Sequence, residues 1–281
     1  MRNEYSALIK PRSILAALAA AMLLGTTAAS AAQCGDGPAG FGGWLESFKA
    51  QVAKKGVKPT AIASALAGVS YDPTVIRLDR SQHSFKLSFE QFYARRVDSA
   101  LIGRGQALML THRATLDRME KRFGVPRAIV IAIWGLETNY GRDAGSKYSI
   151  IRSLATLSYD CRRSEFFTGQ LIDALRIVER GDLTPEQMRG GWAGEIGQTQ
   201  FLPSPYVKYA VDFDGNGSKD LRHSVPDILA STANFLKGHG WQRGQPWQPG
   251  SANYRVLAEW NKAEVYQRTI AAMAAKIGGN S

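Results

Sequence analysis

Apolar residues recur at three- and four-residue steps along most of this chain, which is the spacing of α-helices with one buried face. The clearest case is residues 105–123, where we expect one long amphipathic helix. The residues on its stripe are Leu108, Met109, His112, Leu116, Met119 and Phe123. Strand signals are sparse and no internal repeat is evident, so the pattern predicts a mainly α fold.

Proline and glycine divide the chain into further helices. Pro126, Pro185 and Pro203 stand at or just before helix starts, because proline is tolerated in the first helical turn. The Gly- and Pro-rich residues 240–250 predict a loop before a last helical segment. The predicted helices are 44–55, 60–67, 105–123, 126–141, 149–157, 164–179, a short one opened by Thr184-Pro185-Glu186, 204–210, 225–238 and 262–277.

The first 31 residues have the three parts of a secretory signal peptide. A basic segment precedes an apolar run, and small residues then end in an A-x-A-like cleavage site, Ala29-Ser30-Ala31. The apolar run, 14–24, is too short to cross a bilayer comfortably. The sequence therefore predicts a signal peptide over 1–31, export to the periplasm, no stable membrane span and a functional domain over 32–281.

The chain has two cysteines, Cys34 and Cys161. In an oxidising compartment an even pair predicts one disulfide, and two unrelated thiols are the alternative. Closing so long a loop contributes about 4–5 kcal/mol if the geometry permits it. Cys34 also raises the question of a lipid anchor, but Gln33 stands where a lipoprotein signal needs a small residue. We therefore expect an exported protein without a lipid anchor.

Composition is that of an ordinary globular protein, with 44% hydrophobic and 10% aromatic residues. The net charge is +11, of which the signal segment contributes +2. A basic exported protein suits an anionic partner such as cell-wall peptides, acidic polysaccharide or a membrane surface, or the charge serves only solubility. The dense basic and aromatic clusters of nucleic-acid sites are absent from the sequence, so we expect no nucleic-acid partner.

One acidic residue, Glu137, falls in the apolar stripe of the helix that starts at Pro126. A carboxyl group among apolar side chains is desolvated, which raises its pKa. A carboxylic acid that stays protonated near neutral pH is able to donate its proton to a leaving oxygen. The alternative is an ordinary helix acid paired with Arg142 or Arg127. The residues that share this helical face are Val130, Ile133, Trp134 and Glu137.

Residues 212–218 space oxygen donors as the opening of an EF-hand calcium loop does. The usual acid at position 12 is replaced by His223, and Asp227 is expected to close the site from further along. A structural calcium ion is therefore expected, and an acidic loop without metal is the alternative. The expected ligands are Asp212, Asp214, Asn216, Ser218 and Asp227, so the EF-hand-like loop is 212–227.

The glycine-rich segment 190–204 predicts a backbone able to approach a ligand closely, or else a packing loop between helices. It completes a series of motifs that occur in one order along the chain. These are Trp134-Gly-Leu-Glu-Thr-Asn-Tyr-Gly141, Ser153-Leu-Ala-Thr-Leu157, Arg162-Arg163, Gly197-Gln-Thr-Gln-Phe-Leu-Pro-Ser204, the loop from Asp212 and His239-Gly-Trp241. From about residue 40 onward the chain resembles the B family of lytic murein transglycosylases.

The resemblance implies a lysozyme-like catalytic core with an additional helical lobe and the metal loop. It implies cleavage of the β-1,4 bond between N-acetylmuramic acid and N-acetylglucosamine, leaving a 1,6-anhydro end. Glu137 would act first as acid and then as base, with assistance from the 2-acetamido group of the substrate, and with no second acid or catalytic cofactor. Asp143 is the only rival acid close to it in sequence.

The resemblance also assigns binding roles. Gln200 matches a residue that contacts the muramoyl sugar, and the Arg162-Arg163 pair matches residues that meet carboxylates of the stem peptide. Tyr93, Asn261 and Tyr266 match groove residues. The implied partners are peptidoglycan glycan strands and stem peptides, bound by a monomer.

The chain departs from the family pattern at several positions. Gly191 stands where serine is common, and Phe235 and Trp260 stand where tyrosine is common. The metal loop carries Asp214 at its third position and one extra residue before Asp227. Two other functions remain open from the sequence: a lysozyme-type hydrolase on the same scaffold, and a non-catalytic wall-binding protein.

Overall fold

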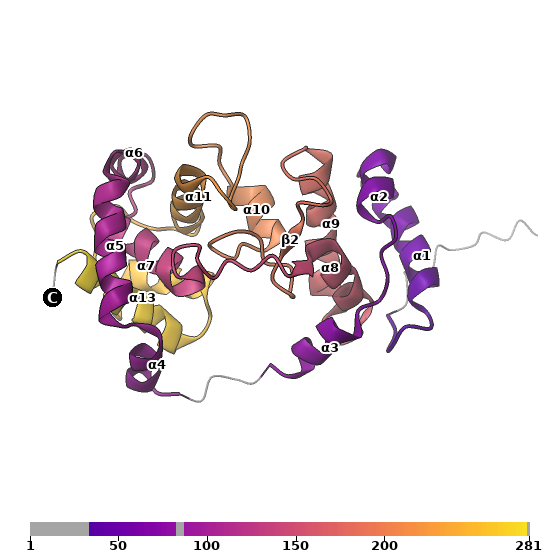
Figure 1. Cartoon of the computed structure of the whole chain (residues 1–281), viewed down its shortest axis with the longest axis horizontal. Coiled ribbons are helices and arrows are strands. Elements are labelled where there is room, and N and C mark those ends of the chain that lie inside the picture. Colours follow the sequence, from indigo (N-terminus) through magenta and orange to yellow (C-terminus); the bar gives the residue numbers. More distant parts are fainter. Residues whose placement is uncertain (1–33, 83–86, 280–281) are drawn as a thin grey trace, which may run out of the picture. The chain divides into compact units, whose positions relative to one another are not determined.

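The computed structural model describes residues 34–82 and 87–279. Within these ranges it contains thirteen helices and one two-stranded sheet, which confirms the predicted mainly α fold (Figure 1). The predicted signal peptide, 1–31, lies outside the described residues. Among the helices that are described, none combines the length and apolar character needed to cross a membrane.

The elements follow one another in the order labelled in Figure 1. They are α1 Phe41–Lys54, α2 Pro59–Ala65, α3 Pro73–Arg80, α4 Phe89–Arg96, α5 Ser99–Thr111, α6 Arg113–Phe123, α7 Arg127–Thr138, β1 Tyr148–Ser149, α8 Ile150–Tyr159, α9 Ser164–Glu179, β2 Arg189–Gly190, α10 Pro203–Tyr209, α11 Val225–Gly238, α12 Ala252–Trp260 and α13 Glu264–Ile277.

Helix α7 is buried along almost its whole length and forms the centre of one group of helices. Its sequence is apolar on all sides, as expected for a helix that is covered all round. Helices α5, α6, α11 and α13 pack against it, and α4 packs on α13. These helices surround α7 in Figure 1.

A second group of helices is built on the antiparallel pair α8 and α9. Helices α1 and α3 pack on α8, and α2 packs on α9, as Figure 1 shows. Helix α10 contacts both α9 and α11 and so connects the two groups. The two strands, β1 and β2, pair through Tyr148 with Gly190 and Ser149 with Arg189.

The amino-terminal end of the described chain is attached to the end of α8. A disulfide joins Cys34 to Cys161, with Cα atoms 5.0 Å apart, and Gly35 donates its N–H to Tyr159 O at 2.8 Å. The aromatic side chains Phe41 and Trp44 of α1 pack on Tyr159. The bridge therefore fastens α1 to the helix pair that it covers.

Two predicted helices were wrong in detail, and three helices were missed. The helix over 105–123 is two helices, α5 and α6, that meet at His112, where ψ rises to 20°. Both helices pack against α7, and the three- and four-residue spacing of apolar residues runs on through His112, so this spacing does not show the bend. The short helix at Thr184 is only a turn, and α3, α4 and α12 were not predicted.

The end of α7 also differs from the prediction, because the helix stops at Thr138 rather than at Gly141. Asn139, Tyr140 and Gly141 follow with φ of 51°, 61° and 82°. Two non-glycine residues in succession in the left-handed region are uncommon and are held by surrounding contacts. The Tyr140 hydroxyl donates to Leu101 O at 2.9 Å, and Asn139 Oδ1 accepts from Arg104.

Candidate functional site

Glu137 lies in the last turn of α7, and its side chain leaves the buried face of that helix toward α12 and α13. Its Oε1 atom accepts two hydrogen bonds, from Trp260 Nε1 at 2.9 Å and from the Tyr266 hydroxyl at 2.8 Å. Since Oε1 is occupied by two donors, a proton on this carboxyl group resides on Oε2. The geometry therefore distinguishes the two oxygens of the acid.

Burial raises the pKa of Glu137 above its usual value. The hydrogen bonds from Trp260 and Tyr266 act in the opposite direction, because they stabilise the ionised form, as does the positive charge of Arg96. Repulsion by Glu195 adds to the increase. Desolvation is the largest of these effects, so the neutral acid is favoured to higher pH than in water.

The alternative that Glu137 is an ordinary paired helix acid does not agree with the contacts. Arg127 instead donates to Glu120 and Asp117 on α6. Among the described residues, neither Arg127 nor Arg142 forms an ion pair with Glu137.

Glu137 lines a groove of about 470 Å³ between the two helix groups. Its walls come from α9, α11, α12 and the loop after β2. The acid also lines a second cavity of about 340 Å³, together with Arg95, Arg96 and Arg104. The groove residues are Gln82, Glu137, Arg163, Phe166, Phe167, Ala193, Glu195, Thr199, Gln200, Phe201, Leu202, Pro205, Phe235, Glu259, Trp260 and Asn261.

The loop after β2, residues 191–202, forms one wall of the groove and depends on several glycines. A Cβ at Gly190 would lie 1.9 Å from Glu195 O, and one at Gly197 would lie 2.2 Å from Leu221 O. Gln200 itself has φ 54°, and its Nε2 donates to Gly197 O at 2.7 Å. Close backbone approach, which the glycine content predicted, therefore builds the loop on which Gln200 stands.

Gln198 joins this loop to its neighbours. Its Oε1 accepts from Trp134 Nε1 at 2.8 Å, and its Nε2 donates to Arg222 O at 2.8 Å. Thr138, the last residue of α7, donates its hydroxyl to Gln198 O at 2.5 Å. The loop is thus attached both to the helix that carries Glu137 and to the segment that follows residues 212–218.

The structure brings together some of the predicted binding residues. Gln200, Arg163 and Asn261 line the groove with Glu137, and Tyr266 contacts Glu137 directly. Tyr93 instead lines a separate cavity beside Lys276, and its hydroxyl is buried without a partner among the described residues. Its predicted place in the groove has no support in this geometry.

The Arg162-Arg163 pair is held by an internal acid that the sequence analysis did not single out. Both guanidinium groups contact Asp79 of α3, which is 1% exposed. Burial opposes ionisation of Asp79, but the hydrogen bonds and charges of the two arginines outweigh it and lower its pKa. Arg163 reaches the groove, whereas Arg162 is not among the lining residues.

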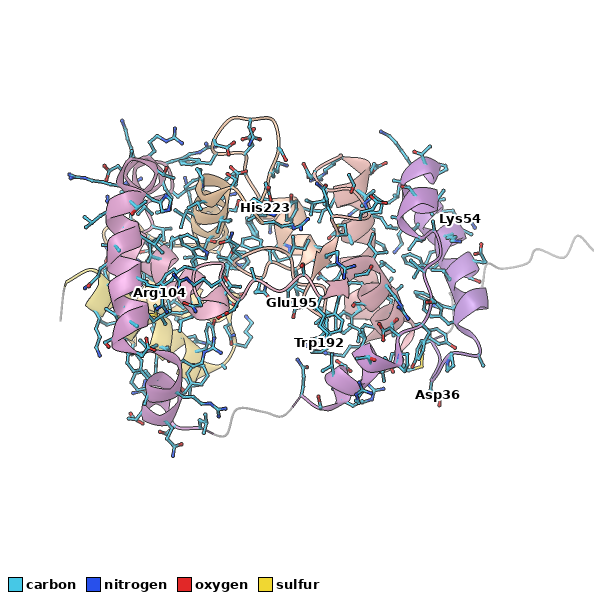
Figure 2. The ribbon with its side chains drawn as sticks, in the orientation of Figure 1. Asp36, Lys54, Arg104, Trp192, Glu195 and His223 are labelled. Carbon is cyan, nitrogen blue, oxygen red and sulfur yellow. A yellow bond between two sulfur atoms is a disulfide. The ribbon has the colours of Figure 1, made fainter. Side chains whose placement is uncertain are left out.

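Two further groove residues had no role assigned from the sequence. Trp260 was noted as a departure from a family tyrosine, and its indole N–H proves to be a hydrogen-bond donor to the acid. Glu195, labelled in Figure 2 on the loop after β2, is a second carboxylate in the same groove. It is 58 positions from Glu137 in the numbering, so sequence proximity gave no signal for it.

Residues 212–218 form a tight turn around their own carboxylates. Asp212 accepts the backbone N–H groups of Gly215, Asn216 and Gly217, and these bonds, that of Gly217 foremost, lower its pKa. One carboxylate oxygen from each of Asp212, Asp214 and Asp227 lies within 4.8 Å of the others. This donor set of hard oxygens fits a calcium ion.

The other expected ligands are placed less directly. Asn216 Oδ1 accepts the N–H of Ser218 at 2.8 Å. Asp227 is fully buried, and its carboxylate accepts the N–H groups of Phe213 at 2.7 Å and Asp220 at 2.9 Å. Asp227 therefore organises the loop whether or not it also binds metal.

Comparison with known proteins adds four similarities. The family model described as Transglycosylase SLT domain matches residues 40–250. Membrane-bound lytic murein transglycosylase B of Escherichia coli is 42% identical over 130 residues, which are 46% of this chain but only 36% of that protein. The match therefore spans little more than a third of the length of that relative.

Two solved structures extend the comparison. SltB3 of Pseudomonas aeruginosa, in complex with NAG-anhNAM-pentapeptide, is 33% identical with a TM-score of 0.78, over 85% of this chain and 80% of that one. Slt35 of Escherichia coli, in complex with calcium, has a TM-score of 0.74 at 24% identity, over 88% and 95% of the two chains. The second likeness is one of fold alone.

Proposed function

This chain belongs to the transglycosylase SLT domain family, and from that premise we propose that it is a lytic transglycosylase of peptidoglycan. It would cleave the β-1,4 bond between N-acetylmuramic acid and N-acetylglucosamine and leave a 1,6-anhydro end. The observation that carries the proposal is a carboxyl group, Glu137, whose pKa is raised by burial and which lines both the groove and the second cavity.

Glu137 would supply both proton transfers. Its Oε2 would give a proton to the glycosidic oxygen as the C1–O bond breaks, while Oε1 stays bound to Trp260 and Tyr266. The two donors would then stabilise the carboxylate that forms. The acetamido carbonyl oxygen of the substrate would bond to C1 as the glycosidic bond breaks. The carboxylate would then take the proton of the C6 hydroxyl while the C6 oxygen bonds to C1 and displaces the acetamido oxygen, which returns Glu137 to its starting state.

The groove supports recognition of sugar on one side and of peptide on the other. Gln200 and Asn261 offer amide groups to sugar hydroxyls and acetamido groups, and Trp260 and Phe235 offer apolar faces. Arg163 offers a guanidinium group, already oriented by Asp79, to a carboxylate of the stem peptide. SltB3 was solved with a disaccharide pentapeptide, which is the class of ligand proposed here.

A calcium ion held by the loop 212–227 would have a structural role. Asp212 and Asp214 would bind it, with Asn216, Ser218 and Asp227 as the further expected ligands. None of these residues is among those lining the groove, so the ion would not contact the substrate. Export to the periplasm, no lipid anchor and action as a monomer remain part of the proposal.

Glu195 gives specific support to a second function, a muramidase that uses water. Glycosidases of the ordinary kind use two carboxylates, and Glu195 and Glu259 line this groove with Glu137. Glu259 is already paired with Lys262 at 2.9 Å, which leaves Glu195 as the second carboxylate. The transglycosylase is favoured because the matching family model is described as a transglycosylase domain and because SltB3 was solved with a fragment that carries an anhydro end.

The test is product analysis. Purified sacculi would be digested with the protein, and the released muropeptides measured by mass spectrometry. We expect anhydro muropeptides, lighter by one water than the reducing products of a hydrolase. Reducing products would refute the transglycosylase. Glu137→Gln, which keeps the size of the side chain, is the negative control, and unchanged release by that variant would exclude Glu137 as the acid. No release by the wild type would favour a non-catalytic wall-binding protein.

A further inference from the structure

The most informative feature that the mechanism leaves unused is the Glu195 carboxylate. It lines the groove with Glu137, and its negative charge is close enough to contribute to the electrostatics of the acid. Figure 2 labels it together with Trp192 on the loop after β2. Glu195 is half-buried, and a carboxylate that is partly removed from water is costly unless it has a partner.

The partners that Glu195 has within the protein are few. Its Oε2 accepts the N–H of Ala193 at 3.0 Å, and its own N–H also stabilises the carboxylate. In the part of the chain that the structure describes, no lysine or arginine forms an ion pair with it. The side chain is therefore oriented by backbone donors but its charge is not compensated.

The orientation depends on Gly191. A Cβ at that position would lie 2.2 Å from Glu195 Oε2 and 2.9 Å from its Cδ. The Glu195 carboxylate thus occupies the space that a side chain at residue 191 would need. A side chain at residue 191 and the present position of the Glu195 carboxylate therefore exclude each other.

A carboxylate in this place suits one group of the substrate. When the acetamido carbonyl oxygen bonds to C1 and the glycosidic C1–O bond breaks, the amide nitrogen gains positive charge and its N–H becomes a stronger donor. A nearby carboxylate accepts that hydrogen bond most strongly in the transition state. The positive charge is lost when the C6 oxygen replaces the acetamido oxygen at C1.

We propose that Glu195 accepts the acetamido N–H of the sugar whose bond is cleaved, and thereby orients that group for attack on C1. The proposal rests on the proposed function, because a transglycosylase activates no water and leaves no general-base role for a second carboxylate. It assigns a substrate-orienting role to a residue outside the single-acid scheme.

The primary variant is Glu195→Gln, which keeps an acceptor for Ala193 N–H and removes the charge. We expect kcat to fall about 10- to 100-fold, the range for loss of one charged hydrogen bond. KM and the thermal midpoint should change little. Glu186→Gln, the same change on an exposed turn, is the matched control and should behave as wild type.

Ligand affinities show whether Glu195 orients the acetamido group of the substrate or only stabilises the loop after β2. A thiazoline analogue of N-acetylglucosamine imitates the ring formed by acetamido attack, and tri-N-acetylglucosamine imitates the ground state. In Glu195→Gln, the Kd of the thiazoline should rise at least tenfold, and that of the trisaccharide less than threefold. Equal losses for both ligands would overturn the proposal.

A second pair of variants tests the placement if Glu195→Gln folds poorly. Gly191→Ser alone should displace the carboxylate and reproduce the kcat of Glu195→Ala. The double variant Gly191→Ser/Glu195→Ala should be no slower than Glu195→Ala. The serine side chain then meets no carboxylate, so the effects of the two changes on kcat are not additive. Wild-type kcat in Gly191→Ser would overturn the placement of Glu195.

Failure of this inference is distinct from failure of the proposed function. Anhydro products formed at the wild-type rate by Glu195→Gln would overturn the orienting role and leave the transglycosylase intact. Reducing products from the wild type that disappear in Glu195→Gln would assign Glu195 as a water-activating base, and both proposals would be wrong.

Discussion

The Tyr266 hydroxyl lies 2.8 Å from Oε1 of Glu137, although the two residues are 129 positions apart. The contact joins the first turn of α13 to the last turn of α7. It also places a neutral donor, rather than a cation, beside the acid. This hydrogen bond lowers the pKa of Glu137, against the larger effect of burial.

Tyr266→Phe should raise the pKa of Glu137 further, because the lost donor stabilised the ionised carboxylate. Activity requires the protonated acid and is lost as pH rises through this pKa. The alkaline limb of kcat/KM against pH should therefore move to higher pH. Tyr254→Phe is the control, since the Tyr254 hydroxyl has no hydrogen-bond partner among the described residues. An unmoved limb in Tyr266→Phe would contradict the assignment of Glu137.

Glu137→Gln should lower kcat by about 10²- to 10⁴-fold, the usual contribution of a general acid. The same change should raise stability at neutral pH. Burial raises the folded pKa of Glu137 above its unfolded value, so the wild type loses stability as pH rises from the unfolded pKa through the folded one.

The comparison is thermal unfolding of both proteins at pH 7 and at a pH below 4.5. Glu137→Gln should melt higher at pH 7, and the gap should close in acid, where the wild-type group is neutral in both states. A variant that melts lower at both pH values would show that the carboxylate is not desolvated as described.

Asp79→Asn should weaken both the fold and peptide recognition, because Asp79 holds Arg162 and Arg163 together. We expect a loss of about 2 kcal/mol, less than for a fully buried pair because the guanidinium groups remain partly in water. The folded pKa of Asp79 is lowered, so its contribution is present above the unfolded pKa and disappears as pH falls through the folded one.

Denaturant unfolding and KM measure the two effects of Asp79→Asn. KM for glycan that carries stem peptides should rise about tenfold, whereas KM for peptide-free glycan should change little. Asp173→Asn removes a local pair with Arg176 on α9 and should cost no more than about 0.5 kcal/mol. Equal changes in KM for the two substrates would argue against peptide binding by Arg163.

Removal of calcium should lower the melting temperature with little effect on turnover at low temperature. A ligand at 100 times its Kd stabilises the fold by about 2.7 kcal/mol, which corresponds to about 5–10 °C for a domain of this size. Melting curves with calcium and with chelator provide the measurement, and Asp212→Asn should reduce the difference. Coincident wild-type curves would remove the metal from the proposal.

Reduction of the bridge between Cys34 and Cys161 should lower the free energy of unfolding by about 4–5 kcal/mol, because it closes a long loop. Denaturant unfolding with and without reductant measures this. Cys34→Ser/Cys161→Ser should match the reduced wild type and should not respond to reductant. A double variant as stable as the oxidised wild type would contradict the expected role.

The hydrophobic period predicted most helices, because burial of one face is a local property of the sequence. This prediction failed where the local structure depends on contacts with residues distant in the sequence. The bend at His112 leaves the apolar stripe continuous, and α3 and α4 are too short and polar to show a clear period. The left-handed run from Asn139 to Gly141 depends on contacts with Leu101 and Arg104 that lie far away in sequence.

The desolvated position of Glu137 was predictable because this residue interrupts an apolar stripe, which is visible from its immediate neighbours. Its donors, Trp260 and Tyr266, come from helices more than 120 residues further along, and only folding shows that they meet one oxygen. Asp79 and Glu195 were missed for the same reason. The role of an isolated acidic residue depends on the side chains that the fold brings next to it, and the sequence around it does not show them.

The side-chain amide of Gln198 is engaged at both ends, by the helix that bears the acid and by the segment that leaves the oxygen-rich turn. A disturbance of that turn therefore reaches the sugar-binding channel through a single hydrogen-bonded step. The concentration of free calcium outside the protein, rather than any side chain that contacts the glycan, would then set the temperature up to which the channel keeps its structure.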